Sequence, residues 1–483
     1  METYQIIRTL KKLDKYTVRS LKEFMSKSPF VSDNKRQLFA ALIVYRPNFN
    51  NKKLTLQAVH EAAFTGTPYC HDKIINLFSD LQHLVELFLV IQFLKKDKFY
   101  FNKLKAIQYY KDENYKAFHK EIAETLRSIN KRDDIFIRFE RQSLFTLLHY
   151  FPHAEQTDLA LPYLSRTNEH LDELYVINKL RYFCELKASK KIIDSENETS
   201  FSPVVLEMAQ QLQANNQLIQ LYLNLYKLDL TTTERHFLAL KDLFVKQLNH
   251  IPYYEGATLL LLLQNHCIQK YLARRSNYLT HQLELYKIGL KNNFFSPKGY
   301  ISHSTYLNIV ITALAKGKLR FVEDFRETYQ KELLTEVRSD CQKLCTGYLN
   351  FELKNFANSK NAISNISSKT FFIDVRKCFL ELKCHFEFYL QNPISANEKQ
   401  LLTACKDFDA YIEQKTLLSN YQKDTYQNFL NLIKIIYQSY QTIVKRLAAD
   451  DAQTIEKVIH QTKTLAGWEY LLSKVRLLSK IKE

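Results

Sequence analysis

One histidine pair has the spacing of a zinc site. His149 and His153 stand four residues apart, and two imidazoles at that spacing on one helix can share a zinc ion. Pro152 lies between them, and because proline cannot continue a helix without a kink, we expect the two rings to diverge. We therefore predict no metal site at this pair.

The eight cysteines offer a second set of metal ligands. Cys341 and Cys345 share a predicted helical face, and Cys378, Cys384 and His385 follow in the next predicted helix. Structural zinc sites use closely spaced cysteine pairs, and the sequence has no C-x-x-C pair. Because cysteine is also a common small filler between helices, we expect buried, reduced thiols of the kind found in cytoplasmic proteins, with no metal or other cofactor.

Short catalytic motifs are missing from the sequence. Its seven glycines form neither G-x-x-x-x-G-K nor G-x-G-x-x-G, so no phosphate-binding loop is present. G-x-S-x-G and H-E-x-x-H, which mark common hydrolases and metalloproteases, are missing as well. We therefore expect a protein that is not an enzyme.

The formal net charge of +17 is concentrated near the N-terminus, where residues 1–120 hold 21 Lys or Arg and 11 Asp or Glu. A basic surface attracts nucleic acid, anionic lipid or acidic proteins, but lysine-rich surfaces also serve solubility alone. The pattern of residues 54–94 predicts a helix, a turn and a second helix, an arrangement that fits a DNA-binding regulator. Its second helix, however, turns an acidic face to solvent, and carboxylates are repelled by phosphates. This face is formed by Asp72, Asn76, Asp80, His83 and Glu86.

Aromatic residues alternate with lysines in two short stretches of the same region, Phe99–Lys103 and Tyr109–Lys111. Such stretches can stack the bases of a single strand, or they can pack between helices. The most apolar run, Leu84–Leu94, has 11 residues and is shorter than a bilayer span requires. With no apolar secretory segment at the N-terminus, we expect a cytoplasmic protein without a membrane span.

The elements that position these residues are predicted to be helices. The chain has 7 glycines and 9 prolines in 483 residues and no Asn-Gly or Asp-Gly, so sharp hairpin turns are scarce. Apolar residues follow a helical spacing over residues 204–228, 236–248, 306–315 and 321–333. Helix start signals stand at Ser202-Pro203, Thr231…Glu234, Ser296-Pro297, Ser395…Glu398 and Ser419…Gln422. The fold class is therefore predicted to be all-α.

A repeating unit is indicated by the tripeptide Tyr-Leu-Asn, which occurs at residues 222–224, 306–308 and 348–350. The intervals are 84 and 42 residues, and around the later copies a helix, a short polar break and a second helix fill one unit. Helix pairs of this size cannot bury their apolar faces alone and stack into arrays. Three copies of a tripeptide are also compatible with coincidence.

The central turns of two units resemble a degenerate tetratricopeptide repeat, at Gly317–Val322 and Lys354–Ser359. Val322 stands where that repeat usually has alanine, and its Trp-x-x-Leu-Gly signature is missing. The whole chain is similar, more loosely, to a group of bacterial helical-repeat proteins, through the stretches Ser28–Lys35, Phe64–Tyr69 and Trp468–Leu472. The resemblance implies a right-handed superhelical array of antiparallel helix pairs, a TPR-like α-solenoid, and it implies no active site.

We therefore expect a basic N-terminal helical region (1–125), a repeat array (126–445) and capping helices (446–483), with Trp468 anchoring the last helix. The predicted function is a non-catalytic scaffold or adaptor that binds a protein or peptide in the groove of the array. Asn224, Asn308 and Asn350 recur at matching positions and are candidates for holding a peptide backbone, although a helix-packing role explains them equally. The alternative is a nucleic-acid-associated regulator that uses the basic N-terminal region.

Overall fold

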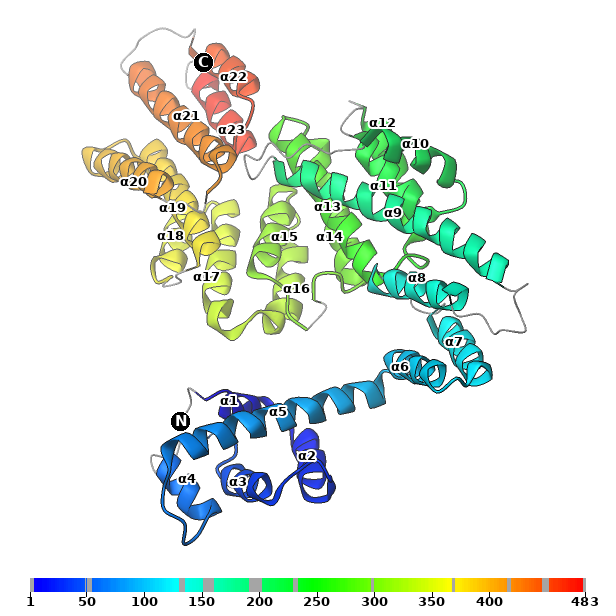
Figure 1. Cartoon of the computed structure of the whole chain (residues 1–483). Helices are drawn as coiled ribbons and strands as arrows, with labels where there is room; N and C mark the ends of the chain where they lie inside the picture. Colours follow the sequence, from blue (N-terminus) through cyan, green and yellow to red (C-terminus); the bar gives the residue numbers. More distant parts are fainter. Residues whose placement is uncertain are drawn as a thin grey trace. The chain divides into compact units, whose positions relative to one another are not determined.

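The chain is all-α, as predicted. The computed structural model describes residues 4–47, 49, 54–129, 135–150, 160–190, 202–228, 233–296, 299–366, 370–414, 418–444 and 451–480. Within these ranges every regular element is a helix and no strand occurs (Figure 1). The chain divides into a first unit, Met1–Lys131 with Leu144–Leu164, and a second unit, Arg132–Ser143 with Ser165–Glu483.

The first unit is built on a core of apolar side chains from α1 to α5. Ile7, Leu38 and Phe88 are among the buried members of this core. Helices α6 and α7 pack on each other, and α8 and α9 contribute residues to both units. The helices are α1 (Gln5–Lys12), α2 (Lys15–Lys27), α3 (Asp33–Ile43), α4 (Leu56–Ala63), α5 (His71–Lys96), α6 (Lys98–Lys111), α7 (Tyr115–Ile129), α8 (Ile135–Tyr150) and α9 (Ala160–Lys190).

Helix α5 extends well beyond the apolar run seen in the sequence. Its 26 residues are long and apolar enough to cross a membrane by length and composition. Ile74, Phe78 and Leu81 from its first half are buried in the core of the first unit, whereas Val90 and Phe93 are exposed. A core helix of a water-soluble protein passes the same test of length and composition.

The second unit is a succession of helix pairs. Helix α11 packs on α12, α13 on α14, α15 on α16, α17 on α18 and α19 on α20, and α15 also packs on α17 and α17 on α19 (Figure 1). The helices are α10 (Ser202–Leu212), α11 (Gln217–Leu228), α12 (Glu234–Gln247), α13 (Tyr253–Leu272), α14 (Asn277–Lys291), α15 (His303–Ala315), α16 (Leu319–Tyr329), α17 (Thr335–Glu352), α18 (Phe356–Ser364), α19 (Phe371–Gln391), α20 (Ser395–Gln414), α21 (Asn420–Val444), α22 (Asp451–Gln461) and α23 (Trp468–Lys480).

Two of the predicted helix boundaries are wrong. The apolar spacing over residues 204–228 belongs to two helices, α10 and α11, because Asn216 starts a new helix by accepting hydrogen bonds from the backbone N–H groups of Leu218 (3.1 Å) and Ile219 (3.3 Å). The helix expected from Ser296-Pro297 begins instead at His303, after Ser302. The Thr231…Glu234 signal lies partly outside the described residues.

Other start and packing signals have the expected geometry. At the start of α21, Ser419 and Gln422 form a reciprocal capping box: each side-chain oxygen accepts a hydrogen bond of 3.2 Å from the other residue's backbone N–H. Between α17 and α18, the buried Ser359 hydroxyl donates to the Gly347 carbonyl oxygen (2.8 Å). The Cβ of any larger residue at Gly347 would lie 2.6 Å from Ile363, so this close approach of the two helices requires glycine.

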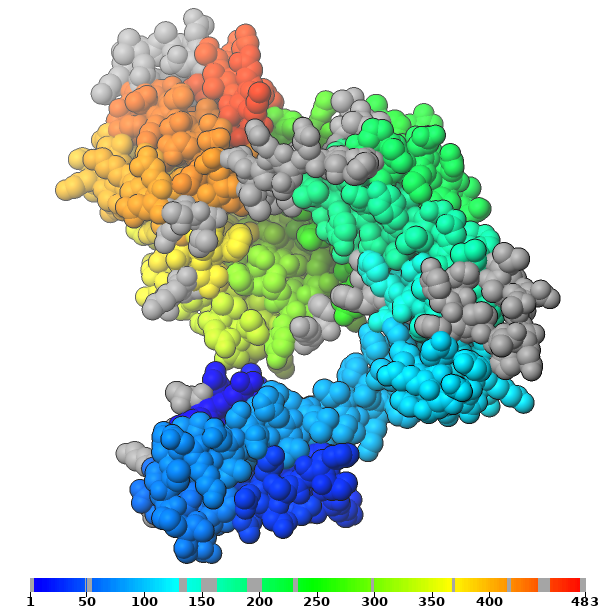
Figure 2. Space-filling model, in the orientation of Figure 1, coloured from blue at the N-terminus to red at the C-terminus, as the bar shows by residue number. Residues whose placement is uncertain are grey.

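The C-terminal helices return to the end of α13. Trp468 is buried, and its indole Nε1 donates to the Tyr271 carbonyl oxygen (3.1 Å), 197 residues away in the chain. The Arg274 guanidinium donates to the carbonyl oxygens of Ile459 (3.1 Å) and Thr462 (2.5 Å). In the space-filling view α22 and α23 lie against α21 (Figure 2). The succession of helix pairs is therefore closed by contacts between segments distant in sequence, which a purely linear array lacks.

Candidate functional site

The three recurring asparagines have different surroundings. On α11, Asn224 is exposed and its Nδ2 donates to the Gln220 carbonyl oxygen (2.8 Å). On α17, Asn350 makes the same bond to the Thr346 carbonyl oxygen (2.9 Å). Both bonds lie within one helix and connect positions i and i−4, a local arrangement that needs no ligand. The structure thus gives Asn224 and Asn350 a helix-internal role.

Asn308 on α15 reaches another helix instead. Its Oδ1 accepts a hydrogen bond of 2.5 Å from the Arg376 guanidinium of α19, and Asn308 also lines a pocket. Arg376 also accepts, at its backbone carbonyl oxygen, a bond of 3.4 Å from the Tyr348 hydroxyl of α17. Asn308 is thus the one recurring asparagine that combines a fixed orientation with a place in a pocket.

This pocket, which we name the amide groove, has a volume of about 560 Å³ and lies beside α13 and α15. Asn308 and residues spaced three or four apart on one face of α13 line it, so the α13 side chains form a stripe about four turns long. Tyr254 and Leu261 of this stripe are 61% and 56% exposed. The α13 stripe consists of Tyr254, Thr258, Leu261, Asn265 and Ile268, with Gln264 beside it.

Gln264 has an unsatisfied hydrogen-bond donor in the amide groove. The side chain is only 4% exposed, yet its Nε2 has no hydrogen-bond partner among the described residues. A buried amide N–H without a partner costs about 1–3 kcal/mol, so most buried polar groups are paired. Gln264 lines the amide groove, and a ligand carbonyl or other acceptor that reached its Nε2 would satisfy this donor.

Two phenylalanines form the aromatic wall of the amide groove. Phe294 packs on Gly256 of α13, where an added Cβ would lie 2.8 Å from the ring. Phe295 packs on Gly289 of α14, where an added Cβ would lie 2.3 Å from the ring. Asn293 has a φ of 55° and turns the chain so that both rings fold back. The two glycines therefore set the width of the groove at this end.

A buried ionic network underlies the same part of α13. The Glu255 carboxylate, 1% exposed, is 3.2 Å from the Arg138 guanidinium of α8 and 3.8 Å from that of Arg181 on α9. The Tyr222 hydroxyl of α11 donates to its other oxygen. Burial, reinforced by the Glu255 charge, raises the pKa of Tyr222 well above its usual value, so this hydroxyl stays a donor. Because Arg181 also lines the groove, the network fixes one edge of the site.

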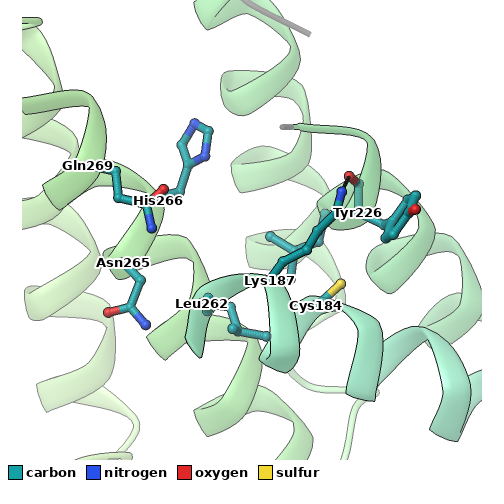
Figure 3. A pocket seen from close by; sticks show the side chains of 9 residues that line it. Cys184, Lys187, Tyr226, Leu262, Asn265, His266 and Gln269 are labelled. Atoms are coloured by element: carbon teal, nitrogen blue, oxygen red, sulfur yellow. Dashed lines mark hydrogen bonds between the residues drawn. The ribbon is translucent and has the colours of Figure 1, made fainter. Parts of the chain in front are cut away.

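A second, much smaller pocket lies on the other side of Asn265. Its volume is about 30 Å³, room for about one water molecule. Figure 3 shows the side chains around it, with Lys187 reaching toward Tyr226, and the Lys187 ammonium donates to the Tyr226 carbonyl oxygen at 3.3 Å. The same ammonium lies 3.7 Å from the centre of the Tyr226 ring. This pocket is too small for a peptide or a metabolite.

The metal-binding candidates are not brought together in the described part of the chain. Burial raises the pKa of Cys345, Cys378 and Cys384 to about 11 and that of Cys341 to about 12, so these thiols stay protonated at neutral pH. Among the described residues no three His, Cys, Asp or Glu side chains are grouped to hold a metal ion. The side chain of His149 and the whole of His153 lie outside the described residues.

The N-terminal candidates for nucleic-acid binding have local partners. On the acidic face of α5, the Asp80 carboxylate is 3.1 Å from the Lys35 ammonium, and Glu86 accepts a bond of 2.6 Å from Gln82. In α6, Phe99 is buried and packs edge-on against Tyr100 with ring centres 4.9 Å apart. Phe99 is therefore a packing residue and is not available to stack on a base.

Comparison with known proteins gives no further guide to the site: no family model, curated protein or solved structure matches this chain.

Of the residues that line the amide groove, only Asn308 was singled out from the sequence. Residues 259–263 are five consecutive leucines or similar apolar residues, which read as a core helix buried on all sides. The signal that was available is the spacing of Tyr254, Thr258, Leu261 and Asn265, which places two polar and two exposed large side chains on one face. Phe294 and Phe295 carry no comparable signal, because their position depends on glycines in two other helices.

Proposed function

We propose that this protein is a non-catalytic adaptor that binds an extended peptide of a partner protein in the amide groove. The observation that carries the proposal is the buried Nε2 of Gln264, which has no hydrogen-bond partner among the described residues, in a pocket of about 560 Å³ that Asn308 also lines. A carboxamide offers both a donor and an acceptor, which is what an extended peptide backbone requires. The aromatic wall and Leu261 supply apolar contacts for side chains of the peptide.

The dimensions of the groove fit a short extended segment. From Tyr254 to Ile268 the α13 stripe covers fourteen helical steps, or about 21 Å. An extended chain advances about 3.3 Å per residue, so about six residues of a peptide lie along the stripe. Among the described residues that line the groove, only Arg181 is charged, and its guanidinium is 3.1 Å from Glu185 and 3.8 Å from Glu255. We therefore expect an uncharged or weakly acidic binding segment.

We also propose that the second unit is a TPR-like superhelical array. Support comes from the packing of the first helices of successive pairs, α15 on α17 and α17 on α19, which is how stacked helix pairs build a continuous core. In such arrays the first helices line the concave surface, and α13 and α15 are first helices of their pairs. Under this proposal the amide groove is one section of that surface.

The experiment is a peptide selection on the purified full-length chain, followed by affinity measurements with the selected peptide. Leu261→Arg places a long charged side chain in the middle of the α13 stripe and should weaken the affinity at least about tenfold, the loss of one good apolar contact. Leu353→Arg is the matched control, because Leu353 is 53% exposed in the turn after α17 and is not among the residues that line the amide groove. Equal affinities of the two variants would refute the proposal.

The nucleic-acid alternative is distinguished by the salt response. Binding through phosphates weakens steeply with salt, because each neutralised phosphate releases counterions. A peptide held by amide and aromatic contacts in the amide groove should lose less than about threefold between 50 and 200 mM salt. If the chain captures nucleic acid with a steep salt dependence and selects no peptide, the regulator function replaces the adaptor function.

A further inference from the structure

A second groove of about 640 Å³ lies between α19 and α20, separate from the amide groove. We name it the charged groove and define it by Lys360, Glu381, His385, Lys399 and Asp407. Its volume is within the range of about 300–1,000 Å³ that is typical of small-molecule sites. Unlike the amide groove, it is lined by two ammonium groups and two carboxylates.

His385 is the buried polar group of the charged groove. The side chain is 7% exposed, and its Nδ1 has no hydrogen-bond partner among the described residues. Burial, together with the nearby Lys360 charge, lowers the pKa of His385 to about 4, so the imidazole is neutral at physiological pH. A neutral imidazole nitrogen that is buried and unpaired calls for a polar ligand atom.

Lys399 and Asp407 lie at different ends of the charged groove. The chain reverses between α19 and α20, and the Asn397 amide donates to the Phe388 carbonyl oxygen (3.4 Å), so the end of α19 lies beside the start of α20. Lys399 near the start of α20 therefore lies at the same end as His385. Asp407 is eight residues further along α20, about 12 Å away.

None of these four charges is paired in the described part of the chain. Lys360, Glu381, Lys399 and Asp407 make no salt bridge there, although ion pairs form elsewhere on the same helices, such as Glu387 with Lys474 at 2.5 Å. The N-terminus of α20, at Ser395, adds its partial positive charge to the Lys399 end. The charged groove therefore presents the Lys399 ammonium and the Asp407 carboxylate about 12 Å apart along α20.

We propose that the charged groove binds a linear zwitterion, namely a short free peptide. Its C-terminal carboxylate lies between Lys360 and Lys399, its amino group lies at Asp407, and a polar backbone atom pairs with Nδ1 of His385. Because an extended chain advances about 3.3 Å per residue, termini about 12 Å apart correspond to about four residues. The proposal does not depend on the amide groove, since no lining residue is shared.

Calorimetric titration of the full-length chain with unblocked tetra-alanine tests the proposal. We expect binding of tetra-alanine and at least about tenfold weaker binding of the same peptide with an acetylated N-terminus and an amidated C-terminus, since each charge-assisted hydrogen bond contributes about 1.5–3 kcal/mol. Dialanine, too short to reach both ends, should also bind at least about tenfold more weakly. Equal affinity for the blocked peptide, or no heat of binding with tetra-alanine at millimolar concentration, would overturn it.

Substitutions that reverse the charge of a groove residue test whether the peptide binds in the charged groove. Lys399→Glu and Asp407→Lys are both exposed substitutions, and each should weaken tetra-alanine binding at least about tenfold. Lys457→Glu on α22 is the matched control, because Lys457 is exposed and lines neither groove. If Lys457→Glu weakens binding as much as Lys399→Glu, the peptide is attracted by overall charge and the site is wrong. His385→Phe should also weaken binding, and the two exposed variants decide the outcome if it does not fold.

Discussion

The amide groove and the charged groove are nearly equal in volume, about 560 and 640 Å³, yet their linings have opposite chemistry. The amide groove is lined by carboxamides and aromatic rings and rests on the buried Glu255 network. The charged groove is lined by unpaired lysines and carboxylates, and its charges are mostly at the surface. The difference shows that grooves of similar volume between packed helices can have either a neutral or a charged lining, depending on which side chains face the groove.

Among the described residues, each groove nevertheless has a buried polar side chain with a nitrogen that lacks a hydrogen-bond partner. In the amide groove it is Gln264, 4% exposed, and in the charged groove it is His385, 7% exposed. An amide keeps the same hydrogen-bonding capacity at every pH, whereas an imidazole changes with protonation. Substitutions in the two grooves should therefore differ in their effect on the free energy of unfolding and on its pH dependence. The two grooves should also accept different kinds of ligand.

The largest expected effect concerns stability. Glu255→Ala removes the carboxylate that pairs with Arg138 and Arg181 and leaves their charges buried, which should lower the free energy of unfolding by about 3–5 kcal/mol. Glu381→Ala in the charged groove removes an unpaired surface carboxylate and should change it by less than about 0.5 kcal/mol. Chemical unfolding measures the free energy of unfolding of both variants. Equal losses in the two variants would contradict the expected difference.

The next effect concerns pH. Because the pKa of His385 is lowered from 6.5 to about 4, the unfolded chain binds its proton more readily than the folded chain. Stability should therefore rise with pH between about 4 and 6.5, by about 2 kcal/mol from pH 5 to pH 7 for this one group. His385→Phe should remove that contribution, as measured by unfolding at both pH values. Gln264→Leu in the amide groove should leave the pH dependence unchanged, and an equal change in both variants would contradict the assignment.

A smaller effect tests the aromatic wall. Gly256→Ala places a Cβ 2.8 Å from the Phe294 ring, so the ring must shift, at a cost of about 1–3 kcal/mol in stability. The same change should weaken binding of the selected peptide, because Phe294 lines the amide groove. Gly66→Ala in the first unit is a control for peptide affinity only: nothing lies within 4 Å of its Cβ, but its φ of 82° strains any residue with a side chain. Unchanged peptide affinity in Gly256→Ala would remove Phe294 from the binding site.

The smallest effect separates the recurring asparagines. Asn308→Ala should weaken binding of the selected peptide about fivefold, the value of one neutral hydrogen bond, because Asn308 lines the groove. Asn224→Ala should leave that affinity unchanged, because Asn224 bonds within its own helix. Calorimetry with one peptide and both variants measures the difference. Equal losses would mean that the repeat position, and not the groove, determines binding.

The fold was more predictable from sequence than the site. The scarcity of glycine and proline predicts the all-α class, and the buried Tyr222 and Tyr306 of the recurring tripeptide are core residues of two helices. The break between α10 and α11 could not be seen from apolar spacing, because the spacing continues across it while Asn216 caps a new helix. The start of α15 was misplaced because Ser302, and not Ser296, caps that helix.

The grooves were less predictable because each combines residues from separate helices. Arg181, Gln264 and Asn308 lie in three helices and meet only in the folded chain. The pairing of Trp468 with Tyr271 joins positions 197 residues apart, and no local pattern indicates it. Periodicity identifies the buried face of a helix, whereas the chemistry of an open face depends on which helices pack around it.

Photo-crosslinking tests the central claim most directly, because it shows where the peptide lies. A photoreactive amino acid is placed at Leu261 in the amide groove and, in a second sample, at Leu353 in the turn after α17. Our account predicts that the selected peptide forms an adduct from position 261 and none from position 353. Adducts from both positions, or from position 353 alone, would contradict peptide binding in the amide groove.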